Sequence, residues 1–186
     1  MINLEKKKPI NLTKSVPSLN QVRVGLSWDD VQINGQSPDC DASVFMLGVN
    51  GKISDDSHFV FYNNLVSGDH SIRHSGDNRT GVGDGDDETI EISLLQVNSS
   101  VEQLIFTITI NNIDAGFDFG NVKNASVRVY DLGNNSIICQ YELTENFSNC
   151  DSLIIGRFYR SGSDWEFEAM GQAFAGGLGA TVELYS

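Results

Sequence analysis

Positive charge is scarce in this chain of 186 residues. Lys and Arg total 12 against 25 Asp and Glu, which gives a formal net charge of −13 at pH 7. Binding to nucleic acid or to an anionic membrane surface requires a basic face on the protein. The composition therefore argues against both functions, and it leaves cations, basic partners and plain solubility open.

Long apolar runs and cysteine pairs are also lacking. No apolar stretch approaches the roughly 20 residues that a membrane-spanning helix needs. Residues 1–8, MINLEKKK, carry positive charge but no apolar segment follows them, so we expect no secretion signal. The three cysteines, Cys40, Cys139 and Cys150, show no C-x-x-C spacing. This pattern predicts free thiols in a reducing compartment, and hence a cytoplasmic protein without a transmembrane segment.

No segment keeps a helical period over three turns. Short runs rich in Val, Ile, Thr, Phe and Tyr instead alternate apolar and polar residues, which is typical of half-buried strands. Turn sequences such as Asn34-Gly35 and Asn50-Gly51 separate these runs, and residues 95–101 leave room for one helical turn. The predicted strands span residues 9–13, 21–28, 42–49, 58–62, 89–92, 103–110, 122–130, 137–143, 152–159 and 165–174.

Many short strands with regular turns predict an all-β fold, a β-sandwich of two antiparallel sheets with long acidic loops. A chain of this length is one domain by the usual size range, and it is long enough to bury a core. No linker or internal repeat interrupts residues 1–186, so we expect a single domain.

One acidic segment, HSGDNRTGVGDGDDE, runs from His74 to Glu88. Like charges at this density repel one another, so the segment is either a solvated, disordered loop or a site for a cation. A long loop inside a compact domain is usually functional. Its possible oxygen ligands are the carboxylates of Asp77, Asp84, Asp86, Asp87 and Glu88, the amide of Asn78, the hydroxyl of Thr80, and glycine carbonyls such as those of Gly83 and Gly85.

Known loop templates do not fit this segment. An EF-hand pattern that starts at Asp77 fails where Arg79, Gly81 and Val82 stand, and no phosphate-binding G-x-x-x-x-G-K-[ST] is present. Hard oxygen ligands on a flexible loop favour calcium, with magnesium or manganese as alternatives. We expect His70 and His74 to be surface residues rather than ligands.

Two shorter acidic groups lie upstream. Asp39 and Asp41 flank Cys40 just before a predicted strand, and they point to one side if the backbone there is extended. Asp29 follows Trp28 at the end of another predicted strand. Each group also suits an ordinary turn at a strand end. Together with the long loop they exceed the needs of one ion, which permits two adjacent calcium ions.

These motifs resemble those of the TerD family of tellurium-resistance and bacterial stress proteins. The similarity covers nearly the whole chain, and Cys40 stands where the family usually has an apolar residue. The matching stretches are VGLSWD at 24–29, DCDAS at 39–43, FVFYNN at 59–64, GDNRTGVGDGDDE at 76–88, FGNVKNASVRVYD at 119–131 and FYRSGSDWEFEAMGQAFAGGL at 158–178.

The resemblance implies a β-sandwich that binds calcium through its loops and acts in stress resistance together with other stress-resistance proteins. It brings no catalytic residues. Glu166 and Glu168 stand where the family has positive residues, so a partner surface differs here. The implied metal ligands are Asp29, Asp39, Asp41, Asp77, Asn78, Asp84, Asp86, Asp87 and Glu88.

Three functions follow as hypotheses. The first is a calcium-dependent interaction or scaffold module without enzyme activity. The second is a divalent-metal-dependent hydrolase, which two metal ions would suit, although no nucleophile–base pair is evident. The third is direct handling of tellurite by Cys40, although a field of carboxylates raises the pKa of a thiol, and burial as a small hydrophobe is the better interpretation of all three cysteines.

Overall fold

A computed structural model describes residues 1–29, 32–76 and 85–186, and it forms a β-sandwich of two six-stranded sheets. The first sheet has the order β1 (Ile2–Asn3), β10 (Ser136–Glu142), β9 (Ser126–Asp131), β3 (Gln21–Ser27), β7 (Glu88–Ser93) and β6 (Ile72–His74). The second has the order β2 (Ile10–Asn11), β12 (Asp164–Phe174), β11 (Ser152–Ser161), β8 (Gln103–Ile110), β4 (Cys40–Leu47) and β5 (Phe59–Val60). Among the described strands only β1 and β10 pair in parallel, so the predicted fold class is confirmed.

The interior between the sheets is built by alternation along the strands. In β4, the side chains of Cys40, Ala42, Val44 and Met46 point into this core. Phe106, Phe158 and Phe167 pack with tilted rings across three neighbouring strands of the second sheet, with ring centroids 5.4 and 4.9 Å apart. The alternate residues of β4 lie on the outer face of the second sheet, and a further layer of structure buries them.

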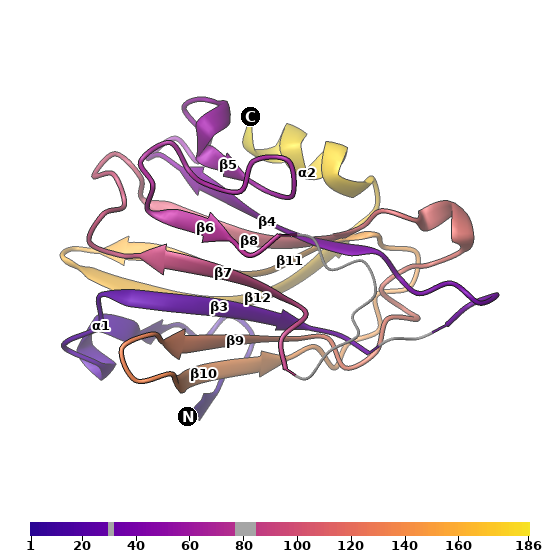
Figure 1. Cartoon of the computed structure of the whole chain (residues 1–186), viewed down its shortest axis with the longest axis horizontal. Coiled ribbons are helices and arrows are strands. Elements are labelled where there is room, and N and C mark those ends of the chain that lie inside the picture. The colour runs from indigo at the N-terminus through magenta and orange to yellow at the C-terminus, as the bar shows by residue number, and fades with distance from the viewer. Residues whose placement is uncertain (30–31, 77–84) are drawn as a thin grey trace.

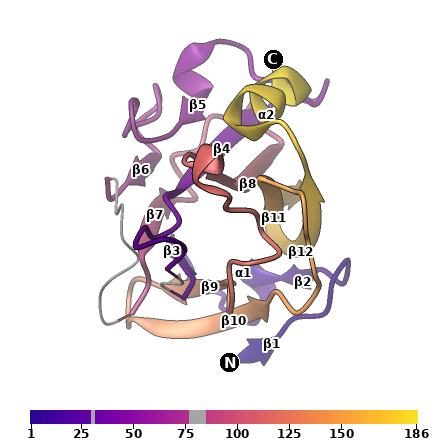
Figure 2. The same cartoon turned by 90° about the vertical axis from the view of Figure 1, so that its right-hand side faces the viewer.

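That layer is helix α2 (Gly177–Tyr185), which lies against the outer face of the second sheet (Figures 1 and 2). Asp151 Oδ1 accepts hydrogen bonds from the amides of Gly176 and Gly177, both at 2.8 Å, and so caps the start of the helix. Val182 and Tyr185 pack on an outer cluster that consists of Phe45, Leu47, Ile105 and Ile154. No described helix crosses the outer face of the first sheet, which stands in front in Figure 1.

Several local predictions were wrong. Helix α2 was not predicted, because it is short, contains Gly177 and Gly179, and depends on packing rather than on its own periodicity. The strand expected at 9–13 is only β2, since Asn11 caps the short helix α1 (Leu12–Ser15) by accepting from Lys14 N. Residues 95–101 form turns rather than a helix, and the strand expected from residue 122 begins at Ser126.

Two 3₁₀ turns, η1 (Asp56–His58) and η2 (Ile113–Ala115), complete the elements. No described helix is long and apolar enough to cross a membrane.

The N-terminal segment joins the two sheets along one side of the sandwich (Figure 2). Its first strand, β1, pairs with β10 of the first sheet, and Leu4 N donates to Gln140 O at 2.7 Å. It then crosses to the second sheet, where Lys7 N donates to Ala169 O at 2.8 Å and β2 pairs with β12. Backbone hydrogen bonds therefore close this side, and on the opposite side the segment after β5 also pairs with β6, through His74 N to Leu65 O at 2.9 Å.

Replacement of Thr107 by Val is expected to stabilise the protein. Thr107 lies on β8 under the outer layer, it is fully buried, and within the described residues its hydroxyl has no hydrogen-bond partner. Valine has the same shape and removes an unsatisfied polar group, so the free energy of unfolding should rise by about 1 kcal/mol. Thermal unfolding measures this as an increase of roughly 2–4 °C.

The matched control is Thr181→Val. Thr181 is equally buried, but its hydroxyl donates to Gly177 O at 3.1 Å, so this variant should show no gain. A loss of stability in Thr107→Val as large as in Thr181→Val would show that the Thr107 hydroxyl is satisfied after all.

Candidate functional site

The start of β4 carries the first acidic motif, DCDAS at 39–43. The second acidic motif is the segment 74–88 that leads into β7. Cys40 pairs with Ile110 and Asp41 with Thr109 on the neighbouring strand β8. The side chain of Cys40 lies in the core, so the alternation of the strand places Asp41 on the opposite face of the sheet. Asp41 is nevertheless only 3% exposed, and a buried carboxylate requires hydrogen bonds or a cation to offset its loss of hydration.

The second motif meets the first at this point. Burial raises the pKa of the Cys40 thiol well above its ordinary value, and the charges of Asp41, Asp39, Glu88 and Asp87 raise it further. Asp39 and Asp41 come from the start of β4, while Asp87 and Glu88 come from the start of β7 in the other sheet. The charges of four carboxylates from two distant sequence motifs therefore act on one thiol.

Glu88 connects the two sheets directly. Its Oε2 accepts a hydrogen bond from Ala42 N at 2.7 Å, and Glu88 is only 1% exposed. β5 pairs with β4 only at Val44 and Phe45, so the backbone of Ala42 lies on an edge that no strand covers within the described residues. A side chain from the first sheet thus satisfies an edge amide of the second.

His74 completes this connection. Gly76 N donates to Nδ1 of His74 at 3.0 Å, so the neutral ring carries its proton on Nε2, which donates to Ala42 O at 3.1 Å. The same Nε2 lies 3.4 Å from Glu88 Oε2. The expectation that His74 is a surface residue was wrong, because it follows Ile72 by two positions on β6 and shares its inward face.

The two aspartates before Glu88 have different partners. Asp87 Oδ2 accepts from the amide of Trp28 at 2.8 Å, just after the end of β3. Burial raises the pKa of Asp87, and the charges of Asp86 and Glu88 add to this shift. Asp86 Oδ1 instead accepts from Arg128 Nη1 on β9, at 2.7 Å. Arg128 was not predicted as a partner of the acidic segment. The sequence feature that could have pointed to it is its place at the end of the stretch FGNVKNASVR, which resembles the family motif.

Asp29 binds a residue outside the acidic motifs. It is exposed, and its Oδ2 accepts from Asn124 Nδ2 at 2.6 Å. Gly85 has a φ of +118°, a backbone conformation that favours glycine. The other predicted site residues, Asp77, Asn78, Thr80, Gly83 and Asp84, lie outside the described residues.

The donor set is chemically consistent with a hard cation. It consists of carboxylate oxygens, which calcium and magnesium prefer, while the buried thiol of Cys40 is held in its protonated form. Within residues 1–29, 32–76 and 85–186, however, no three acidic, histidine or cysteine side chains are placed to hold a metal by themselves. A complete cation site at this position therefore requires further ligands.

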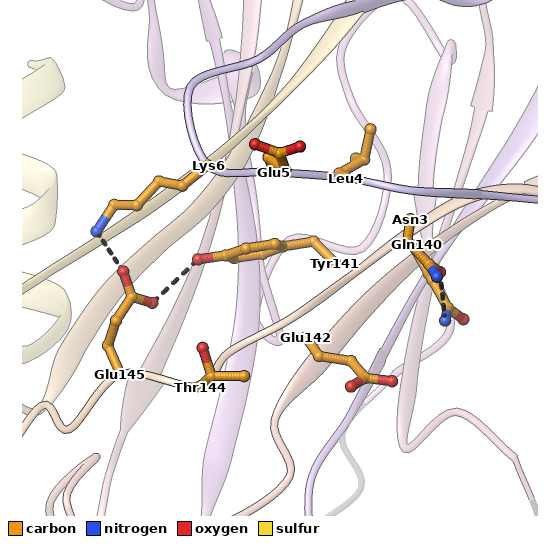
Figure 3. Close-up of a pocket in the computed structure, with 9 residues that line it drawn as sticks. All are labelled: Asn3, Leu4, Glu5, Lys6, Gln140, Tyr141, Glu142, Thr144 and Glu145. Carbon is orange, nitrogen blue, oxygen red and sulfur yellow. Dashed lines mark hydrogen bonds and ion pairs between the residues drawn. The ribbon is translucent and has the colours of Figure 1, made fainter.

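A separate cavity of about 450 Å³ lies between the N-terminal segment and β10 (Figure 3). Glu145 lines one side of it, where it accepts from Lys6 Nζ at 2.8 Å and from the Tyr141 hydroxyl at 3.0 Å. Burial and the bond to Glu145 raise the pKa of Tyr141 to about 12. These groups satisfy one another, and no residue of the acidic motifs lines the cavity.

Comparison with known proteins agrees with the architecture. The model of the TerD domain family matches residues 1–185. The chain is 44% identical over 185 residues to the tellurium resistance protein TerD of Serratia marcescens, covering 99% of this chain and 96% of that protein. It is 41% identical over 186 residues to general stress protein 16U of Bacillus subtilis, with coverage of 99% and 96%. The crystal structure of a homologue of the telluride resistance protein TerD from Streptomyces coelicolor aligns with a TM-score of 0.69 at 23% identity, over 89% of this chain and 96% of that one.

Truncation of Glu88 tests whether it joins the sheets. Glu88→Ala leaves the amide of Ala42 without its charge-assisted hydrogen bond, so in the presence of a chelator the free energy of unfolding should fall by about 3 kcal/mol. Urea unfolding measures this change. The control is Glu91→Ala on the same strand, an exposed position where a change within about 0.5 kcal/mol is expected. Equal effects of the two variants would contradict the role given to Glu88.

Proposed function

The chain belongs to the TerD domain family, and from this premise we propose that it is a calcium-binding stress-response protein that acts as a calcium-dependent interaction or scaffold module. The family match confirms the resemblance read from the motifs, and the family includes tellurium resistance and general stress proteins. The observation that carries the calcium proposal is the hydrogen bond from the amide of Ala42 to Glu88, which ties the acidic segment 74–88 to the residue that follows Asp41 in the DCDAS motif.

Calcium explains why so many carboxylates share this part of the fold. A cation with a charge of +2 offsets their mutual repulsion, and calcium accepts six to eight oxygens at variable geometry. The described carboxylates supply part of such a shell, and Asp77, Asn78 and Asp84 of the same motif are proposed to supply the rest. We propose two ions per chain because the two motifs together contain more carboxylates than one ion needs.

Binding of calcium at this point is proposed to act through the loops that join the sheets. Glu88 and His74 already tie the start of β7 and the end of β6 to the edge of β4. A cation shared between β4 and the segment before β7 would rigidify the same junction, since metal binding and local folding are coupled. The ordered loops would then present a surface to another stress-resistance protein in the cytoplasm, without a catalytic step.

Calorimetric titration tests the calcium proposal. Protein stripped with a chelator and titrated with Ca²⁺ against a background of Mg²⁺ should bind about two ions, with a dissociation constant of roughly 10⁻⁷–10⁻⁵ M. Asp41→Asn should weaken binding of at least one ion by about tenfold or more, because a buried carboxylate next to the cation is lost.

The matched control is Asp56→Asn, which neutralises an exposed aspartate in η1 outside both acidic motifs, and its binding should equal that of the unmodified protein. No heat of binding and an unchanged melting temperature on addition of Ca²⁺ to the unmodified protein would remove the calcium function.

Thiol reactivity separates this function from direct tellurite chemistry. Cys40 and Cys139 are buried, and burial raises the pKa of the Cys139 thiol to about 12. In the folded protein at about pH 8 we therefore expect a thiol reagent to label only the partly exposed Cys150 at an appreciable rate, since the thiolate is the reactive form. Rapid labelling of Cys40, assigned by mass spectrometry, would instead favour a chemical role for this thiol.

A further inference from the structure

Three consecutive acidic residues before and at the start of β7 are directed to three different parts of the fold. Glu88 binds the amide of Ala42 on β4, and Asp87 binds the amide of Trp28 after β3. Asp86 binds Arg128 on β9. Two of these three contacts are to backbone amides, and the contact of Asp86 is to the positive charge of Arg128.

The carboxylate of Asp86 rests on the outer face of the first sheet. Its position lies directly over Gly25, since a Cβ atom added to Gly25 would stand 2.0 Å from Asp86 Oδ2. Gly25 pairs with Arg128 across β3 and β9, so the missing side chain at residue 25 opens the space in which the two charges meet. The Asp86 side chain is only 6% exposed in this position.

The surroundings reinforce the ion pair. The pKa of Tyr130 is raised by burial and by the nearby negative charge of Asp86, so its hydroxyl keeps its proton. The guanidinium of Arg23 stacks on the ring of Tyr130 at 4.4 Å. The Asp86 carboxylate therefore lies on the outer face of the first sheet beside Arg128, whereas the neighbouring Glu88 is buried against β4.

From this geometry we propose that Arg128 is a positioning residue that withholds Asp86 from the calcium site and thereby sets the affinity of that site. The inference rests on the proposed calcium function, and it departs from the ligand set that the motif implies, in which Asp86 is a ligand. Calcium sites are tuned by the number of charged ligands and by their rigidity. An arginine that neutralises one carboxylate of the motif lowers that number by one.

A double-mutant cycle of calcium affinities tests the proposal. In Arg128→Gln the Asp86 carboxylate is released from its only ionic partner among the described residues, so Ca²⁺ should bind about tenfold more tightly. Asp86→Asn retains the oxygen that accepts from Arg128, and its affinity should stay within about threefold of the unmodified protein with the same number of ions. In the double variant Arg128→Gln/Asp86→Asn the gain should disappear, because the effect of Arg128 acts through Asp86.

Two further variants serve as controls. Arg128→Lys keeps the positive charge beside Asp86 and should restore the original affinity within about threefold, which a purely structural role of the arginine would not predict. Arg73→Gln removes an exposed arginine from the same face of the first sheet, on β6, and should leave the affinity unchanged. Thermal unfolding in chelator identifies any variant that fails to fold, and Asp86→Asn alone still decides whether Asp86 is a ligand.

The outcomes are distinct. Loss of one bound ion in Asp86→Asn, or a drop in affinity beyond about tenfold, would identify Asp86 as a ligand and overturn the proposal. A gain in Arg128→Gln that persists in the double variant would mean that Arg128 acts on the ion through space and not through Asp86, which also overturns it. Absence of calcium binding in the unmodified protein would overturn the calcium function itself, whereas the other two results leave that function standing.

Discussion

The junction between the two sheets at Ala42 is the contact on which the candidate site depends. β4 leaves the backbone of Ala42 at an edge, and Glu88 and His74 of the first sheet supply its acceptor and its donor. A buried amide or carbonyl without a partner costs about 1–3 kcal/mol, so this contact fixes how the sheets meet on that side. The same contact joins the residue after Asp41 to the residue after Asp87, since Ala42 and Glu88 are the groups that form it.

The distribution of negative charge follows from this junction. Glu88 and Asp87 are held by backbone amides, and Asp86 is held by Arg128 over the space that Gly25 leaves. Each anchor directs one carboxylate of a continuous acidic run to a different strand. The negative charges of the run are thereby offset by hydrogen-bond donors of the protein and, in the proposed function, by bound calcium.

The fold class and part of the site were predictable because their signals are local. The alternation in residues 103–110 gave the limits of β8, and the DCDAS and GDGDDE motifs marked carboxylates whose charges act on Cys40, while their role as metal ligands stays a prediction. The remaining features depend on contacts between distant segments. Helix α2 is stabilised by the outer cluster rather than by its own sequence, His74 is buried by β4, and Arg128 becomes part of the site only through the register of β3 and β9.

The central claim is that a cation lies beside Asp87, and therefore beside Trp28, whose amide Asp87 binds. Terbium substitutes for calcium at oxygen sites, and its luminescence is sensitised by a nearby indole, so tryptophan excitation of the terbium-loaded protein tests the claim directly. We predict sensitised emission that Ca²⁺ displaces, that is lost in Trp28→Phe and that is retained in Trp165→Phe. Emission that depends on Trp165, or no sensitised emission at all, would contradict a cation at this position.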